Sequence, residues 1–229
     1  MISVRRMLLL QLLIETKDGA SELNYLRDGL KLTDEVFNSL ILELTESKTI
    51  TLSDNTVMLT LSQRLDVVVK ALESGADIEV VSRSLTWLEF EELCARVFEE
   101  NGFKVRRRFR FSAEGRRWEI DLFAFKKPWI ILAECKHWIR GMNNSATRGV
   151  IEKHLTKSNV LAEHIAEISV KVGVNGWGVS TIIPIALTLS ATPLDMYGRV
   201  PCVSILALPS FLSDFNGYLT YLATFKVSI

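Results

Sequence analysis

Two carboxylates and an amine stand out in residues 116–138, because they lie in short apolar runs that each have the composition of a β-strand. Asp121 lies in WEIDLFAF, and Glu134 and Lys136 lie in PWIILAECK. Charged groups flanked by aliphatic residues are costly to desolvate unless they are paired or bind a metal. Carboxylate oxygens can hold a hard divalent cation, and an amine beside them can offset charge on a phosphate. Metal-assisted hydrolysis is therefore a candidate chemistry.

The two apolar runs are expected to form a β-hairpin. The sequence KKP separates them, and proline lacks the amide that a central strand needs. Because side chains alternate along a strand, Glu134 and Lys136 share a face, and a tight reversal near Lys127 and Pro128 would bring Asp121 close to Glu134. The alternative is a set of ordinary ion pairs at strand ends, since Glu-x-Lys alone occurs in many chains by chance.

A helix with clear boundaries precedes the hairpin. Thr86 and Glu89 have the spacing of a capping box, and Asn101–Gly102 supplies a left-handed stop, so a helix is expected over Trp87–Glu100. Glu91 lies at the edge of the apolar stripe of this helix. It either faces inward as a further metal-side carboxylate or is a solvated surface glutamate.

Helix, strand, strand with aspartate, strand with Glu-x-Lys, helix: this order resembles the PD-(D/E)xK nuclease superfamily, in particular Mrr-type restriction endonucleases and archaeal Holliday-junction resolvases. The residues that carry the resemblance are Trp87, Phe90, Glu91, Gly102, Phe103, Ile120, Asp121, Glu134, Cys135 and Lys136. The resemblance implies an α/β fold, a restriction-endonuclease-like mixed sheet flanked by helices. It also implies a metal-dependent phosphodiesterase: Asp121 and Glu134 bind Mg²⁺ (or Mn²⁺), Glu91 assists, and Lys136 acts at the attacking water or scissile phosphate.

Residues 104–117 form a dense basic segment that contains one acid, Glu114. The whole chain has 27 basic and 27 acidic residues, so this local cluster, rather than the net charge, indicates a polyanionic partner. Contacts to DNA phosphates are expected from these side chains and from two on a later helix: Arg106, Arg107, Arg108, Arg110, Arg116, Arg117, Arg148 and Lys153. The alternatives are an edge strand protected by its charges and a solvated helix face.

Residues 1–61 are expected to form a small winged-helix (α+β) domain, with three helices followed by a hairpin around Asp54–Asn55. The third helix would enter the major groove in the usual docking. It carries Asp34, Glu35, Glu43 and Glu46. Because such a charge is poor for DNA, contact with DNA and contact with protein both remain open. Residues 62–83 are expected to be a helical linker, and residues 84–229 the nuclease domain.

Two functions follow from these patterns. The first is a Mg²⁺-dependent DNA endonuclease for restriction or for branched DNA, expected to be a homodimer because cutting two strands requires two sites. The second is a winged-helix DNA-binding or regulatory protein with a catalytically inactive nuclease-like domain. Three cysteines without a CxxC pair predict a reduced cytoplasmic protein, and the absence of an apolar run of ~20 residues predicts no membrane partner. The histidines are interpreted as structural or surface residues.

Overall fold

The computed structural model describes residues 2–136, 144–189 and 195–229. Its internal contacts divide the chain into two units, Met1–Glu89 and Phe90–Ile229. Helix α6 (Trp87–Glu100) crosses the division, so its first turn belongs to one unit and its remainder to the other. The predicted α/β fold class is confirmed. The first unit has helices and a small sheet, and the second has a mixed sheet.

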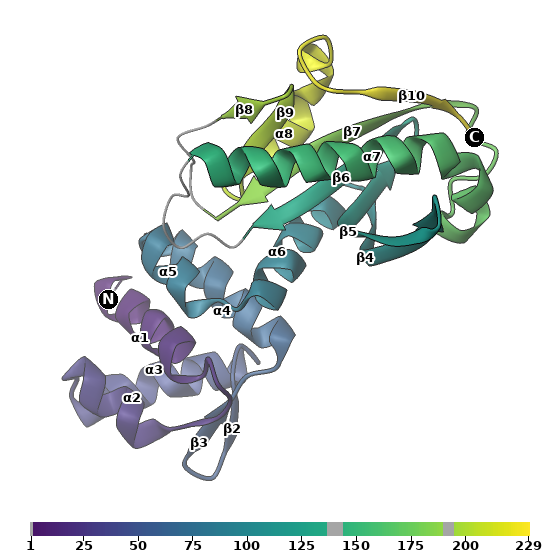
Figure 1. Ribbon diagram of the computed structural model, residues 1–229. Helices are drawn as coiled ribbons and strands as arrows, with labels where there is room; N and C mark the ends of the chain where they lie inside the picture. The colour runs from purple at the N-terminus through teal and green to yellow at the C-terminus, as the bar shows by residue number, and fades with distance from the viewer. Residues whose placement is uncertain (1, 137–143, 190–194) are drawn as a thin grey trace. The chain divides into compact units, whose positions relative to one another are not determined.

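The N-terminal unit has the element order of a winged helix (Figure 1). Its elements are α1 (Ile2–Glu15), β1 (Ser21–Glu22), α2 (Leu23–Leu30), α3 (Asp34–Glu46), β2 (Thr51–Ser53), β3 (Thr56–Met58), α4 (Leu61–Glu73) and α5 (Ile78–Ser84). The three strands pair in the order β1-β3-β2. Strand β1 and helix α5 lie outside the sequence prediction, because two- and seven-residue elements leave little periodic signal.

A buried ion pair between Arg64 of α4 and Glu89 of α6 lies within this unit. The guanidinium also donates to the carbonyl oxygen of Leu13 (3.2 Å), to Thr16 Oγ1 (2.7 Å) and to the carbonyl oxygen of Ser84 (2.9 Å). A buried charge with this many partners is compensated in full, so the pair joins α1, α4 and α5 to the start of α6.

The predicted boundaries of α6 are confirmed. The Thr86 amide donates to Glu89 Oε2 (2.7 Å) and the Glu89 amide donates to Thr86 Oγ1 (3.2 Å), which are the two reciprocal bonds of a capping box. Gly102 follows the helix at φ +81°, in the left-handed region where glycine has no steric penalty. Local sequence alone therefore determines both ends of this helix.

The C-terminal unit is a mixed seven-stranded sheet with helices against it (Figure 1). After α6 its elements are β4 (Lys104–Ala113), β5 (Arg116–Lys126), β6 (Trp129–Lys136), α7 (Asn144–Val172), β7 (Val179–Thr188), β8 (Met196–Tyr197), β9 (Val200–Ser204), α8 (Leu208–Asp214), a 3₁₀ turn (Phe215–Tyr218) and β10 (Phe225–Ser228). The strand order is β4-β5-β6-β7-β9-β8, with β10 paired to β7. The β4–β5 and β5–β6 pairs are antiparallel, whereas the β6–β7 and β7–β9 pairs are parallel.

Helix α7 covers one face of this sheet (Figure 1), and its apolar side packs on the strands. Val160, Leu161 and Ile165 of α7 share a buried cluster with Ile130 and Leu132 of β6. Strand β6 is buried from Ile130 to Cys135, as expected for a strand with neighbours on both sides and covered faces. The sheet therefore holds any polar side chain of β6 in a fixed position.

The alternation of side chains breaks where β4 passes Asp121. Arg108 has φ +47°, and the β4–β5 ladder pairs Arg107 with Leu122 and then Phe109 with Ile120, leaving Arg108 opposite Asp121 without a ladder pair. Arg107 bonds to α6, yet Phe109, two residues on, joins the cluster that packs against α7. Unbroken alternation would put both side chains on one face. A strained, broken ladder of this kind recurs at functional sites.

Candidate functional site

The β5–β6 hairpin brings Asp121 and Glu134 to neighbouring positions. Leu122 pairs with Ala133, so the next residues of the two strands, Asp121 and Glu134, face each other across the end of the ladder. Both carboxylates are 8% exposed. Asp121 Oδ2 accepts a hydrogen bond from the backbone amide of Cys135 (2.8 Å), which fixes its orientation.

Glu134 has an amine on each carboxylate oxygen. Lys136 Nζ lies 2.8 Å from Oε1, and Lys157 Nζ of α7 lies 2.5 Å from Oε2. The fully buried imidazole of His154 is close as well, with Nδ1 3.5 Å from Oε2 and Nε2 2.9 Å from the carbonyl oxygen of Leu132. Glu134 is thus the centre of a charged cluster that draws on β6 and α7.

The charge states of this cluster follow from burial and from the facing groups. Burial would raise the pKa of Glu134, but the facing His154, Lys157 and Lys136 lower it below its usual value. Burial lowers the pKa of His154 to about 4, so its imidazole is neutral at pH 7 and Nε2–H donates to Leu132. Lys136 and Lys157 therefore compensate the Glu134 charge at neutral pH.

Glu91 of α6 is the least compensated acid among the described residues. It is 2% exposed, and neither oxygen has a hydrogen-bond partner in the described part of the chain. Arg108 Nε lies 3.5 Å from Oε2. Burial, and then the charge of Asp121, raise the pKa of Glu91 to about 7. Burial and the charge of Glu134 raise the pKa of Asp121 to about 6.

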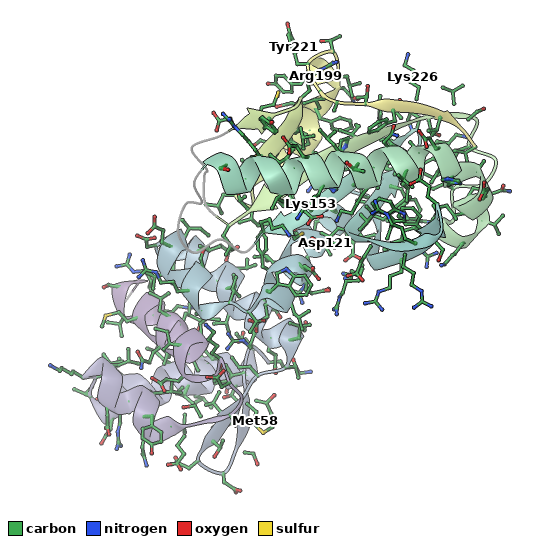
Figure 2. The ribbon with its side chains drawn as sticks, in the orientation of Figure 1. Met58, Asp121, Lys153, Arg199, Tyr221 and Lys226 are labelled. Carbon is green, nitrogen blue, oxygen red and sulfur yellow. The ribbon has the colours of Figure 1, made fainter. Side chains whose placement is uncertain are left out.

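A cavity of about 640 Å³ opens beside Glu134 and Lys136. Its lining contains five basic residues and two acidic ones: Arg116, Arg117, Lys136, Lys153 and Lys157, with Glu119 and Glu134. Lys153 projects from α7, and Asp121 lies on β5 (Figure 2). An excess of positive charge in a hollow favours an anionic ligand such as a phosphate.

The predicted phosphate-contacting residues have different surroundings. Arg116, Arg117 and Lys153 line the cavity, and Arg116 stacks on Trp118 at 3.4 Å from the ring centroid. Arg107 instead bonds to Glu92 (2.6 Å) and Glu99 (2.9 Å) of α6.

The remaining predicted arginines are exposed and lie outside the cavity lining. Arg110 pairs with Glu119 (2.5 Å), and Arg148 lies over the Tyr197 ring at 5.4 Å. Arg106 is exposed on β4, and Arg108 faces Glu91. Of the predicted phosphate contacts, three therefore line the cavity, while Arg107, Arg108 and Arg110 pair with neighbouring acids.

The predicted metal ligands approach one another without forming a metal-binding group. In residues 2–136, 144–189 and 195–229, no three His, Cys, Asp or Glu side chains are grouped closely enough to hold an ion. The three acids nonetheless interact electrostatically, since the charge of Asp121 raises the pKa of Glu91 and the charge of Glu134 raises the pKa of Asp121. In this site neighbouring carboxylates repel one another, and Glu134 is paired with two amines, those of Lys136 and Lys157.

From sequence, Lys157 belongs with Arg148 and Lys153 to a helix face that either adds to the DNA surface or is solvated, and its direct contact with Glu134 is not predicted. The helical period offers a signal, because Ile151, His154, Ser158, Leu161 and Ile165 are buried along one face of α7 and Lys157 borders it. The period does not reveal which strand that face meets, so the contact with a residue 23 positions away could not be inferred.

None of the described helices is long and apolar enough to cross a membrane. A comparison with curated proteins gave no match. Among solved structures, protein VC1899 from Vibrio cholerae is 13% identical over 96% of this chain and 52% of that chain, with a TM-score of 0.41. The restriction endonuclease FokI is 13% identical over 94% of this chain and 44% of that chain, with a TM-score of 0.41. The chain spans about half the length of these two proteins.

A family model described as restriction endonuclease (Mrr_cat) matches residues 82–158. The matched segment contains α6, the β5–β6 hairpin and the part of α7 that carries His154 and Lys157. The resemblance to PD-(D/E)xK nucleases is thereby confirmed for this segment, and residues 82–158 are similar to the restriction endonuclease family.

Proposed function

We propose that this chain is a metal-dependent endodeoxyribonuclease that hydrolyses phosphodiester bonds of DNA with Mg²⁺, or Mn²⁺ in its place. The observation that carries the proposal is the pairing of Asp121 and Glu134 across β5–β6, beside Lys136 and at the edge of a basic cavity. The family match of residues 82–158 supports the reaction class. The choice of substrate, whether a restriction site or a branched structure, belongs to the proposal as well, as does action on duplex DNA by two copies.

The donor set fits a hard divalent cation. Mg²⁺ prefers oxygen ligands and keeps several waters, so one or two carboxylates suffice to hold it. Asp121 and Glu134 would supply these, and the buried oxygens of Glu91, which have no hydrogen-bond partner in the described residues, would assist. Burial, and next the charge of a neighbouring acid, raise the pKa values of Glu91 and Asp121, and a bound cation would favour the ionised form of both. Each oxygen of Glu134 already has an amine, so a cation there would compete with Lys136 and Lys157.

When bound, the cation would polarise a phosphoryl oxygen and lower the pKa of a water. In the reaction the water oxygen forms a bond to phosphorus while one ester P–O bond breaks; the water loses a proton and the leaving oxygen gains one. The Cys135 amide keeps Asp121 oriented throughout. Lys136, whose pKa is raised by Glu134 against the effect of burial, stays protonated and can offset charge on the phosphate.

The decisive test is cleavage by single-site variants. Asp121→Asn, Glu134→Gln and Lys136→Ala are each expected to lower the rate of DNA nicking with Mg²⁺ or Mn²⁺ by at least about a hundredfold, since each removes a group at the reacting phosphate. Glu100→Gln, an exposed acid at the end of α6, is the matched control and should cleave like the original protein. Substrates should include duplex, junction, flap and single-stranded DNA. Unchanged nicking in all three variants would refute the proposal.

The second candidate is a DNA-binding or regulatory protein whose nuclease-like domain is inactive. The clamp of Lys136 and Lys157 on Glu134 favours it, because an acid paired on both oxygens is satisfied without an ion. Calorimetric titration with Mn²⁺ separates the two functions. The nuclease predicts binding that vanishes in Asp121→Asn, whereas the inactive module predicts no binding to either protein.

A further inference from the structure

Helix α7 places a second lysine at the centre of the cluster. Lys157 Nζ bonds to Glu134 Oε2 (2.5 Å) and to the backbone carbonyl oxygen of Glu119 (3.1 Å). Its side chain is 18% exposed, and it lines the same cavity as Lys136. Nothing in the Glu-x-Lys pattern of β6 requires this residue, so its position comes from the fold alone.

The two amines on Glu134 have different anchors. Lys136 is held by Glu134, and its position two residues along the same strand ties it to that carboxylate. Lys157 has a second acceptor, the carbonyl oxygen of Glu119, which belongs to the backbone of β5. If Glu134 exchanged an amine for a cation, Lys157 would retain a partner inside the cavity.

An ammonium group has three donors and no acceptor. The described residues give Lys157 two acceptors, which leaves one donor for a ligand in the cavity. A half-buried ammonium among three further basic rim residues, Arg116, Arg117 and Lys153, is also a poor choice for structure alone, because like charges there repel one another. A phosphate in the cavity would relieve that repulsion.

We propose that Lys157 is a second catalytic lysine of the site, whose ammonium contacts a phosphate of the bound DNA next to Lys136. The inference rests on the proposed nuclease function and adds a residue that the Glu-x-Lys pattern does not contain. In it, Lys157 pairs with Glu134 in the free protein and keeps the Glu119 carbonyl while it binds the phosphate.

The test measures DNA binding and cleavage separately. Binding of a labelled duplex is measured in EDTA at several salt concentrations for the original protein and for Lys157→Met, which keeps the aliphatic stem. Each lost phosphate contact lowers the slope of log K against log salt by about one. Lys157→Met is expected to show this drop and to cleave at least about tenfold more slowly with Mg²⁺. Lys157→Arg should restore the slope.

The control is Lys226→Met, on β10 and outside the cavity lining (Figure 2), which should leave slope and rate unchanged. If Lys157→Met melts below the assay temperature, Lys157→Gln, which can still donate to Glu134, replaces it with the same expected slope. A slower rate with an unchanged slope would assign Lys157 a merely structural role and overturn the inference. If the slope drops but the original protein cleaves no DNA with any metal, the proposed nuclease function fails while the phosphate contact stands.

Discussion

Two buried glutamates on the same helix, one in each unit, have opposite surroundings. Glu89, in the first turn of α6, pairs with Arg64 and accepts from the Thr86 amide. Glu91, two residues later, has no hydrogen-bond partner in the described residues and a pKa raised to about 7. Burying a charge is costly unless it is paired and hydrogen-bonded. The comparison separates a carboxylate that stabilises the fold from one whose burial is offset, among the described residues, only by the Arg108 guanidinium 3.5 Å away.

The largest expected effect comes from replacing Glu89, the glutamate whose charge is compensated. Glu89→Gln should lower the free energy of unfolding by about 3 to 5 kcal/mol, because it leaves the buried guanidinium of Arg64 without its counter-charge. Urea unfolding followed by circular dichroism measures the change. The exposed Glu100→Gln protein should stay within about 0.5 kcal/mol of the original. An equally small change in Glu89→Gln would remove the distinction between the two glutamates.

Replacement of Glu91, which has no hydrogen-bond partner in the described residues, should have the opposite effect on stability. The folded-state pKa of Glu91 is about 7 against 4.5 for the unfolded chain, so the folded state binds the proton more tightly. The associated stability is complete below pH 4.5 and is lost as the pH rises through 7. Glu91→Gln, which mimics the protonated form, should therefore raise the free energy of unfolding at pH 8 by about 1 to 3 kcal/mol and change it little at pH 4.5.

Thermal unfolding of metal-free protein at the two pH values measures this effect. Added Mn²⁺ sharpens the comparison, since the proposed ion should stabilise the original protein more than Glu91→Gln at pH 8. Destabilisation by Glu91→Gln at pH 8 without metal would mean that the Arg108 guanidinium compensates the ionised carboxylate in spite of its burial.

The smallest expected effect concerns the cap that supports Glu89. Thr86→Ala removes the acceptor of the Glu89 amide and should lower the free energy of unfolding by about 1 kcal/mol. Thr86→Ser keeps the hydroxyl and should be close to the original. Urea unfolding measures both, and equal stability of the alanine and serine variants would show that the ion pair alone holds this turn.

The sequence predicts best those features that depend on neighbours in the chain. The capping box at Thr86, the stop at Gly102 and the reversal between β5 and β6 follow from residues a few positions apart, and the pairing of Asp121 with Glu134 follows from that reversal. Helical periodicity left the direction of Glu91 open, and its burial became evident only from the packed helix.

Features that depend on distant segments could not be predicted. The basic composition of residues 104–117 suggests that Arg107 contacts a phosphate. In the fold, Arg107 pairs with Glu92 and Glu99, which lie on another element, α6. The approach of Lys157 to Glu134 depends on how α7 crosses the sheet. The left-handed backbone of Arg108 has no signal in a run of arginines, because glycine is the residue that usually indicates it.

The backbone of Arg108 has a consequence for the whole cluster. A residue with a β-carbon in this region costs about 1 to 3 kcal/mol of conformational free energy, and glycine would adopt the same angle without it. Glycine would also delete the ion-pair partner that the described residues give Glu91. Glycine at this position would therefore relieve the strained backbone and isolate that acid in one step, whereas alanine would isolate the acid and keep the strain.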